Sequence, residues 1–223
     1  MKTFSAAIIR SNFQTSVNTA RTLVEQGEKT ASNEAGILDV SKETRGLAFV
    51  ILFAGYESLL KGLSREMLEV ASSFRGKIEN LRPQFATAGL SGCIQSIREI
   101  QKSKLWHEAA PAILVKLSNK ADCINTGFFP DDGSFMNQSQ IRCFCSYYSL
   151  PDPAKILEKT WSDIPTVRRA RNNIAHGEET PSEVGRNYTY SEVLDIVFNW
   201  EKHWLKFIDN VEAIASQKTF YIK

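Results

Sequence analysis

Apolar residues recur every three or four positions along the first part of the chain, from about Thr3 to Gln26. The repeating residues are Ile9, Phe13, Val17, Ala20 and Val24. This spacing places them on one face of a helix. Thr3 is a suitable N-cap and Gly27 a suitable end, so the pattern predicts an amphipathic helix over this range.

A second, longer helix is predicted from Ser41 onward, and its centre is apolar nearly all round, which is typical of the middle of a bundle. Its most apolar run, Leu47 to Tyr56, is shorter than the ~20 residues that span a bilayer, and Glu57 and Lys61 follow it. The N-terminus has no signal-peptide pattern. We therefore expect a soluble, cytoplasmic protein with no membrane partner.

The last helix, Tyr190 to Ile214, has the clearest pattern. Its apolar face consists of Val193, Val197, Trp200, Trp204, Ile208 and Val211. Weaker helices are expected near 91–100, 104–118 and 138–148, separated by a turn-rich loop at 125–137. No alternating strand pattern occurs. The chain is thus predicted to be one all-α domain over 1–223, a helical bundle with an irregular helical insertion (75–150) between its second helix and its last two.

Composition narrows the function only slightly. Charged residues make up 23% of the chain and the net charge is +2, which excludes a strongly cationic nucleic-acid coat but allows a local basic patch. The cysteines (Cys93, Cys123, Cys143 and Cys145) form no CxxC pair. A zinc site with His107 or His203 is conceivable, but the irregular spacing favours reduced, mostly buried thiols. We expect neither a metal nor a cofactor.

One segment carries candidate chemistry. Asp163 and Pro165 are typical of a helix start, and Gly177 is typical of the left-handed residue that ends a helix. At 100° per residue, Arg171 falls within the apolar arc of this helix. A buried charge without a partner costs about 3–5 kcal/mol. Arg171 therefore needs a carboxylate, a phosphate or a subunit boundary.

Arg168, Asn172 and His176 form a row beside that arc at positions i, i+4 and i+8. His176 is suited to exchange protons near neutral pH, and Asn172 can orient the imidazole. Arginine, histidine and amide together suit a phosphodiester substrate, particularly RNA, whose 2′-hydroxyl can attack its own phosphate. The alternative is that His176 and Gly177 merely cap the helix.

The string Arg171-Asn172-Asn173-Ile174-Ala175-His176-Gly177 resembles the Arg-x4–6-His motif of HEPN-domain proteins, and it looks most like the RiboL-PSP and related HEPN nucleases. Residues 52–61 look like the second helix of that family, and the loop 125–136 resembles the segment before its motif helix. The resemblance implies a helical bundle that forms a homodimer with a composite, metal-independent RNase site. Such cleavage leaves 2′,3′-cyclic phosphate and 5′-hydroxyl ends.

By this resemblance, His176 is the general base or acid, Arg171 binds the scissile phosphate, and Asn172 orients the histidine or the phosphate. Arg171 and His176 lie about 140° apart on one helix. They would converge more easily across a two-fold axis. The resemblance also implies a toxin or defence effector with RNA as substrate and an antitoxin or immunity partner.

Three further residues are weaker candidates. Glu57 either supports the site near Arg171 or forms an i, i+4 pair with Lys61. Arg168 and Arg169 are candidate RNA-binding residues, although exposed arginines are usually just solvated. The alternative function is a non-catalytic HEPN dimer that binds RNA or a protein. A purely structural helical protein is the third possibility.

Overall fold

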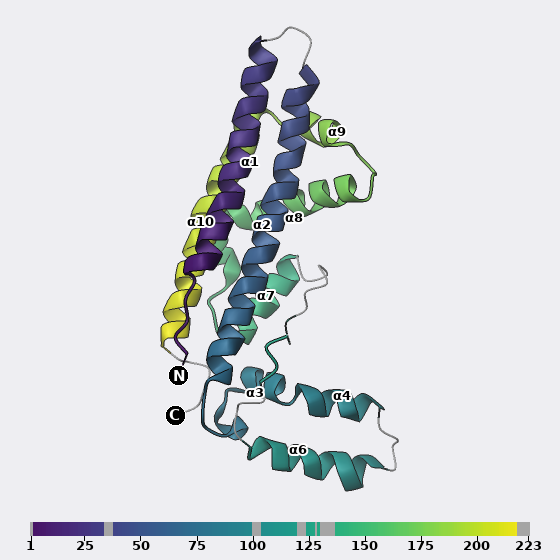
Figure 1. Cartoon of the computed structure of the whole chain (residues 1–223). Helices are drawn as coiled ribbons and strands as arrows, with labels where there is room; N and C mark the ends of the chain where they lie inside the picture. Colours follow the sequence, from purple (N-terminus) through teal and green to yellow (C-terminus); the bar gives the residue numbers. More distant parts are fainter. Residues whose placement is uncertain are drawn as a thin grey trace.

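The computed structural model describes residues 2–33, 38–99, 104–119, 124–127, 129 and 137–217. Every regular element among these residues is a helix and none is a strand, so the predicted all-α fold is confirmed. Figure 1 shows long helices packed side by side and a smaller group of helices at one end.

Helices α1 (Ala7–Asn33) and α2 (Leu38–Ser72) form an antiparallel hairpin (Figure 1). The predicted bounds of the first helix were wrong at both ends, because α1 starts after Thr3 and continues past Gly27. A Cβ on Gly27 would lie 2.0 Å from the Thr44 Oγ1 on α2. The glycine is therefore used for close helix packing and does not end the helix.

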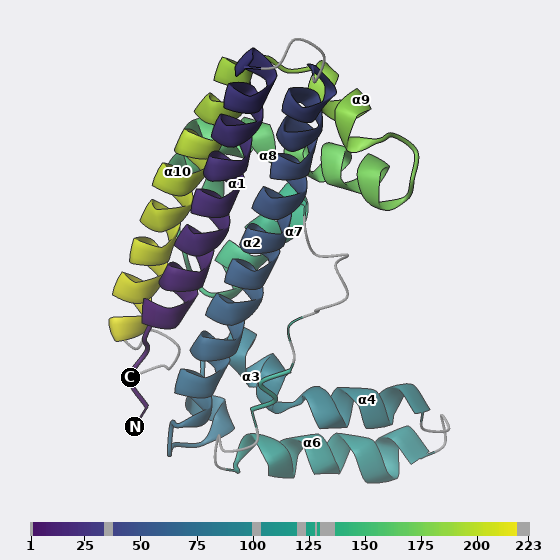
Figure 2. The same ribbon diagram turned by 45° about the horizontal axis from the view of Figure 1, so that its top comes forward.

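Helix α10 (Tyr190–Ser216) lies along α1 and completes the long bundle (Figure 2). All six residues of its predicted apolar face are buried, which confirms that face. The ring of Tyr56 on α2 packs against two of them, with ring centroids 5.8 Å from Trp200 and 5.1 Å from Trp204. An aromatic cluster thus joins α2 to α10 at the centre of the core.

Three more helices pack on this bundle: α7 (Gln138–Tyr147), α8 (Pro153–Ala175) and α9 (Pro181–Arg186). Helix α9 lies against the first half of α2 at very short range. A Cβ on Gly185 would lie 1.8 Å from the Lys42 carbonyl oxygen, and one on Gly46 would lie 2.0 Å from the Pro181 carbonyl oxygen. The paired glycines fix α9, and with it the end of α8, against α2.

The segment 75–150 has two parts with different surroundings. Its first part contains η1 (Ile78–Asn80), α3 (Pro83–Gly89), α4 (Ser91–Glu99), η2 (Leu105–Ala109) and α6 (Ala110–Leu117). Of these, α4 and α6 form an arm that projects from the lower end of the bundle (Figure 2). Its last part, α7, belongs to the core, where Ile141, Phe144 and Cys145 are buried.

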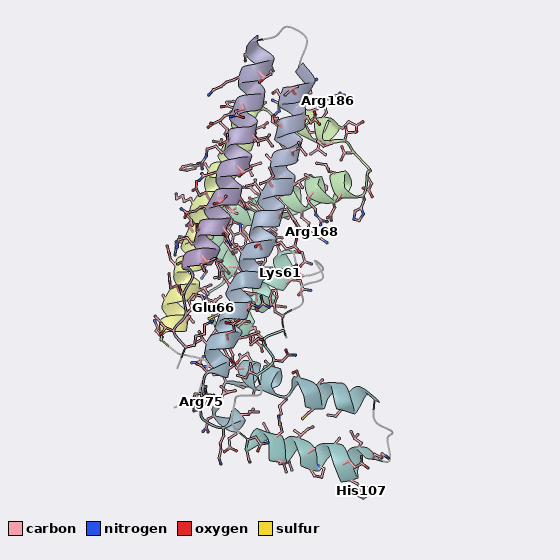
Figure 3. All side chains as sticks on the ribbon, viewed as in Figure 1. Lys61, Glu66, Arg75, His107, Arg168 and Arg186 are labelled. Atoms are coloured by element: carbon pink, nitrogen blue, oxygen red, sulfur yellow. The ribbon has the colours of Figure 1, made fainter. Side chains whose placement is uncertain are left out.

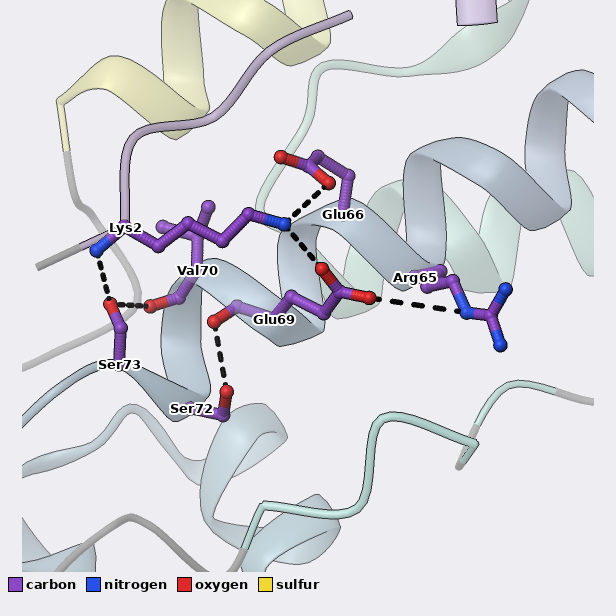
Figure 4. Close-up of polar contacts among 7 residues, drawn as sticks. All are labelled: Lys2, Arg65, Glu66, Glu69, Val70, Ser72 and Ser73. Atoms are coloured by element: carbon purple, nitrogen blue, oxygen red, sulfur yellow. Dashed lines mark hydrogen bonds and ion pairs between the residues drawn. The ribbon is translucent and has the colours of Figure 1, made fainter.

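The start of the chain is tied to the end of α2 (Figure 4). The Lys2 Nζ binds the Glu66 carboxylate at 2.8 Å and also binds Glu69, while the Lys2 backbone N–H donates to the Ser73 Oγ at 3.0 Å. These contacts hold residues 2–6 across the hairpin, so that Phe4 and Ala6 can enter the core.

Helix α2 is longer than the apolar run 47–56 suggested. Its Val40–Ser72 part is long enough to cross a membrane, and the most apolar window of 18 residues within it has a mean hydropathy of 1.5. However, 56% of that stretch's most apolar window is buried against the rest of the protein. The apolar surface of α2 is thus largely covered by α1, α8, α9 and α10.

Candidate functional site

Helix α8 consists of two helical stretches joined at a kink, because Glu158 between them has a non-helical backbone (φ +47°, ψ −119°). Asp152 is the N-cap of the first stretch, and its Oδ1 accepts a hydrogen bond from the Ala154 backbone N–H at 3.1 Å. The stretch that carries the motif follows Glu158, so it begins before Asp163 and the predicted start at Asp163 was wrong. Asp163 lies inside α8 and is half-buried, and burial raises the pKa of its carboxyl group.

Pro165 lies inside α8 without breaking it. A proline has no N–H to donate to the carbonyl four residues earlier, here that of Trp161. The Nε2 of Gln138 on α7 donates to this carbonyl at 2.6 Å. A side chain from a neighbouring helix thus replaces the missing hydrogen bond, and this replacement lets the helix run on through the proline.

The end of α8 has the geometry that the sequence predicted. Gly177 has φ of +72°, and its N–H donates to the Ile174 carbonyl at 3.2 Å. The N–H of Glu178 donates to the Asn173 carbonyl at 2.8 Å. These two bonds make a Schellman motif, which confirms Gly177 as the left-handed residue after the helix.

His176 is the C-cap residue and its side chain is exposed. The cap is made by backbone groups, and among the described residues no side-chain hydrogen bond or ion pair involves the imidazole. The helix end therefore does not need a histidine for its hydrogen bonding. An exposed imidazole at this place is free to contact a ligand.

Arg171 is half-buried on the side of α8 that faces α2. Its guanidinium carbon lies 4.8 Å from the centroid of the Phe53 ring, and its Nη1 donates to the Asn172 Oδ1 at 3.0 Å. Stacking of this kind contributes about 0.5–2 kcal/mol. Within the described part of the chain no carboxylate forms an ion pair with this guanidinium. Its described partners are the Phe53 ring and the neutral amide of Asn172.

The amides beside Arg171 have separate partners. The Asn172 Oδ1 accepts from Arg171 and so holds the guanidinium, whereas the described contact between Asn172 and His176 is the backbone hydrogen bond of the helix, at 2.9 Å, and involves neither side chain. The Asn173 Nδ2 donates to the Glu179 carboxylate, which ties the loop after α8 back to the helix. Asn172 is thus a positioning residue for Arg171 in this structure.

The three weaker candidates are also placed. Of the two possibilities for Glu57, the structure shows the ion pair with Lys61, at 2.8 Å, and Glu57 forms no described ion pair with Arg171. Arg168 and Arg169 are exposed. Figure 3 shows Arg168 on the side of the bundle away from α10.

A cleft of about 270 Å³ lies between α7 and α8, next to Arg168. It is lined by Asn137, Gln138, Ser139, Ile164, Pro165 and Arg168. Sequence reasoning did not single out Asn137, Gln138 or Phe53. The one available signal was Pro165, because a proline within a helix requires an outside donor for the carbonyl that it leaves free.

A second polar cluster joins the buried side chains of Thr160 and His203 to the exposed side chains of Glu158 and Lys206. The Thr160 Oγ1 lies 3.0 Å from the His203 Nδ1, and the Glu158 carboxylate lies 3.5 Å from the His203 Nε2. Glu158 has φ of +47° where α8 kinks, and its other oxygen accepts from the Lys206 Nζ at 2.6 Å.

His203 is only 3% exposed, and burial lowers its pKa, with Lys202 and Lys206 adding to that effect and Glu158 and Asp163 opposing it. Thr160 has no exposed surface. The arrangement resembles a nucleophile, base and acid, but no substrate can reach the hydroxyl. We therefore assign a structural role to this cluster.

The cysteines are in different surroundings. Cys145 is buried, and burial raises the pKa of its thiol to about 12, whereas Cys93 is half-buried and Cys143 is exposed. Cys123 lies outside the described residues. In the part of the chain that the structure covers, no three His, Cys, Asp or Glu side chains gather as metal ligands would.

Comparisons with models of known protein families, with curated proteins and with solved structures find no match for this chain. The resemblance to HEPN nucleases therefore depends on the string 171–177 and, more loosely, on residues 52–61 and 125–136.

Proposed function

We propose that this protein is a metal-independent endoribonuclease of the HEPN type. It cleaves RNA through attack of a 2′-hydroxyl on the adjacent phosphate. The observation that carries the proposal is the half-buried Arg171, which stacks on Phe53 and has no carboxylate partner among the described residues. A cation held in this way favours an external anion, and a phosphate fits it by charge and by the forked geometry of its donors.

The chemistry needs two proton transfers and one source of positive charge. His176 removes the proton of the 2′-hydroxyl, and the 2′-oxygen then attacks the phosphorus atom. Arg171 stabilises the negative charge of the phosphorane. The P–O5′ bond breaks, and the 5′-oxygen takes a proton from an imidazolium. The products are a 2′,3′-cyclic phosphate and a 5′-hydroxyl.

A homodimer brings the two groups together more readily than one chain does. Arg171 faces α2, whereas His176 is exposed at the end of α8. Two copies of α8 related by a two-fold axis would place Arg171 of one protomer near the imidazole of the other. The two imidazoles of such a dimer could then divide the base and acid roles.

Cleavage of mixed RNA in EDTA, followed by analysis of the new ends, tests the proposal. We expect chelator-resistant cleavage that His176→Ala reduces by about 10²–10⁴-fold, as for loss of a general acid–base group. The matched control is His107→Ala, because His107 is also exposed but lies on η2, in the distant arm (Figure 3). Arg171→Lys keeps the positive charge but loses the forked set of donors, and Arg75→Lys makes the same change at an exposed arginine near the far end of α2 (Figure 3).

The outcomes separate the alternatives. Cleavage lost in the His176 and Arg171 variants and kept in both controls supports the enzyme. Tight RNA binding without cleavage points to the non-catalytic module. If the wild type neither binds nor cleaves RNA and His176→Ala changes only stability, the helix end is structural and the proposal fails.

Mixing two inactive variants tests the composite site. Arg171→Ala and His176→Ala chains that form mixed dimers keep one site with a native Arg171 from one chain and a native His176 from the other. We expect partial recovery of cleavage on mixing. No recovery, despite mixed dimers, would place both residues of each site in the same chain.

The biological role of a toxin or defence effector, with an antitoxin or immunity partner, belongs to the same proposal. It is supported only by the resemblance of the 171–177 string.

A further inference from the structure

The cleft between α7 and α8 has the chemistry of a ligand site. Its volume of about 270 Å³ is close to the lower end for small-molecule pockets. Pro165 and Ile164 supply an apolar wall, and Arg168 supplies a positive charge at its edge. Asn137 and Gln138 line the other side with amide groups.

Both amides are held in known orientations by contacts within the protein. The Gln138 Nε2 donates to the Trp161 carbonyl at 2.6 Å, and a carbonyl can only accept, so the amide cannot be the other way round. The Asn137 Oδ1 accepts from the Gln140 backbone N–H at 3.0 Å. The Gln138 Oε1 and the Asn137 Nδ2 are therefore left without a protein partner within the described residues.

The cleft continues the row of residues that contains the candidate catalytic histidine. Arg168 lies one helical turn before Asn172 and two turns before His176 on α8, a rise of about 12 Å. A single RNA strand that places a phosphate at the helix end can thus place a neighbouring nucleotide at the cleft. This cleft would then contact RNA beside the scissile bond, not at it.

On these grounds we propose that the cleft binds one unpaired nucleobase of single-stranded RNA, with Arg168 on its phosphate, and so sets the cleavage preference of the nuclease. One acceptor and one donor match the polar edge of a base, which pairs an N–H with an acceptor, and the proline wall can cover its flat face. This inference depends on the proposed function, since it names the substrate-reading part of that site.

Binding of short oligonucleotides to a non-cleaving His176→Ala background tests the inference. Labelled eight-nucleotide strands of A, C or U are titrated and the Kd is measured by fluorescence anisotropy. We expect Arg168→Gln to weaken binding to all three strands by about ten-fold, as for loss of a phosphate contact beside a base. Arg75→Gln makes the same charge change at an exposed arginine near the far end of α2, away from the cleft (Figure 3), and we expect a change of less than about two-fold.

Asn137→Asp tests base reading with the fold preserved. An aspartate keeps the oxygen that caps α7 but loses the Nδ2 donor. We expect the ratio of the Kd values among A, C and U to change by about five- to ten-fold. The unfolding midpoint of this variant, measured in parallel, should stay near that of the parent.

Equal losses of affinity in Arg168→Gln and Arg75→Gln, or unchanged Kd ratios among A, C and U in Asn137→Asp, would overturn the proposal that the cleft binds a base. These results are separable from a failure of the proposed function. If cleavage depends on His176 but base preference does not depend on Asn137, the proposed base-binding cleft is rejected and the proposed nuclease activity stands. If base preference depends on Asn137 but cleavage does not need His176, the proposed catalytic role of His176 is rejected and the base-binding cleft stands. If no strand binds, the base-binding cleft is rejected.

Discussion

The hydrogen bond from Gln138 to the Trp161 carbonyl gives the sharpest test of how this fold is held together. Gln138→Met keeps the length of the side chain but removes the donor. Because Pro165 supplies no N–H, the Trp161 carbonyl then has no partner on the protein. Leaving a buried acceptor unpaired costs about 1–3 kcal/mol. Gln138 is half-buried, so water can reach the site in part, and we expect about 1–2 kcal/mol.

The reasoning can be checked with a second substitution. Pro165→Ala restores a backbone N–H one helical turn after Trp161, and this group can donate to the same carbonyl. In the Pro165→Ala background, Gln138→Met should therefore cost less than about 0.5 kcal/mol. The two sites should show a coupling energy of about 1 kcal/mol, within the range for residues that share a hydrogen-bond partner.

The free energy of unfolding is measured for the wild type, the two single variants and the double variant by urea unfolding. Tryptophan fluorescence reports the transition, since the chain has 4 tryptophans. A change of 1 kcal/mol should also shift the melting temperature by about 2–4 °C for a chain of this size. If Gln138→Met costs the same amount with proline and with alanine at position 165, the bond is not a replacement for the missing helical one. The account of why α8 runs through the proline would then be wrong.

Two further predictions concern stability. Gly185→Ala places a Cβ 1.8 Å from the Lys42 carbonyl oxygen, so α9 must shift away from α2, and we expect urea unfolding to show a loss of about 1–3 kcal/mol in stability. The control is Gly92→Ala, whose Cβ would meet no atom within 4 Å. Equal losses in the two variants would show that the close contact between helices is not the cause. His203 is neutral when buried because its folded-state pKa is lowered, so its contribution to stability is complete above the unfolded pKa of about 6.5 and is lost as the pH falls toward the folded value. We expect the free energy of unfolding to fall below pH 6.5 by up to about 1.4 kcal/mol per pH unit, and His203→Gln to flatten this slope; an unchanged slope in the variant would assign it to other groups.

Much of the fold was accessible from local patterns. The apolar face of α10, the helices near 91–117 and 138–148, and the left-handed Gly177 were all predicted, because periodic burial and a positive φ are properties of neighbouring residues. Arg171 was also expected to lie on the core side of its helix, and it is half-buried.

The remaining features depended on residues far away in the sequence. Gly27 has the sequence pattern of a helix end, but in the fold it lies where Thr44 approaches α1. Pro165 has the pattern of a helix start, but α8 continues through it because Gln138 donates to the carbonyl that the proline leaves free. The partner of Arg171 could not be deduced either, because the Phe53 ring comes from α2. Periodicity reports which face of a helix is buried, whereas only the packed structure decides what meets that face. Hydrogen bonds and close approaches between helices are made by whichever side chains the fold brings within a few ångströms.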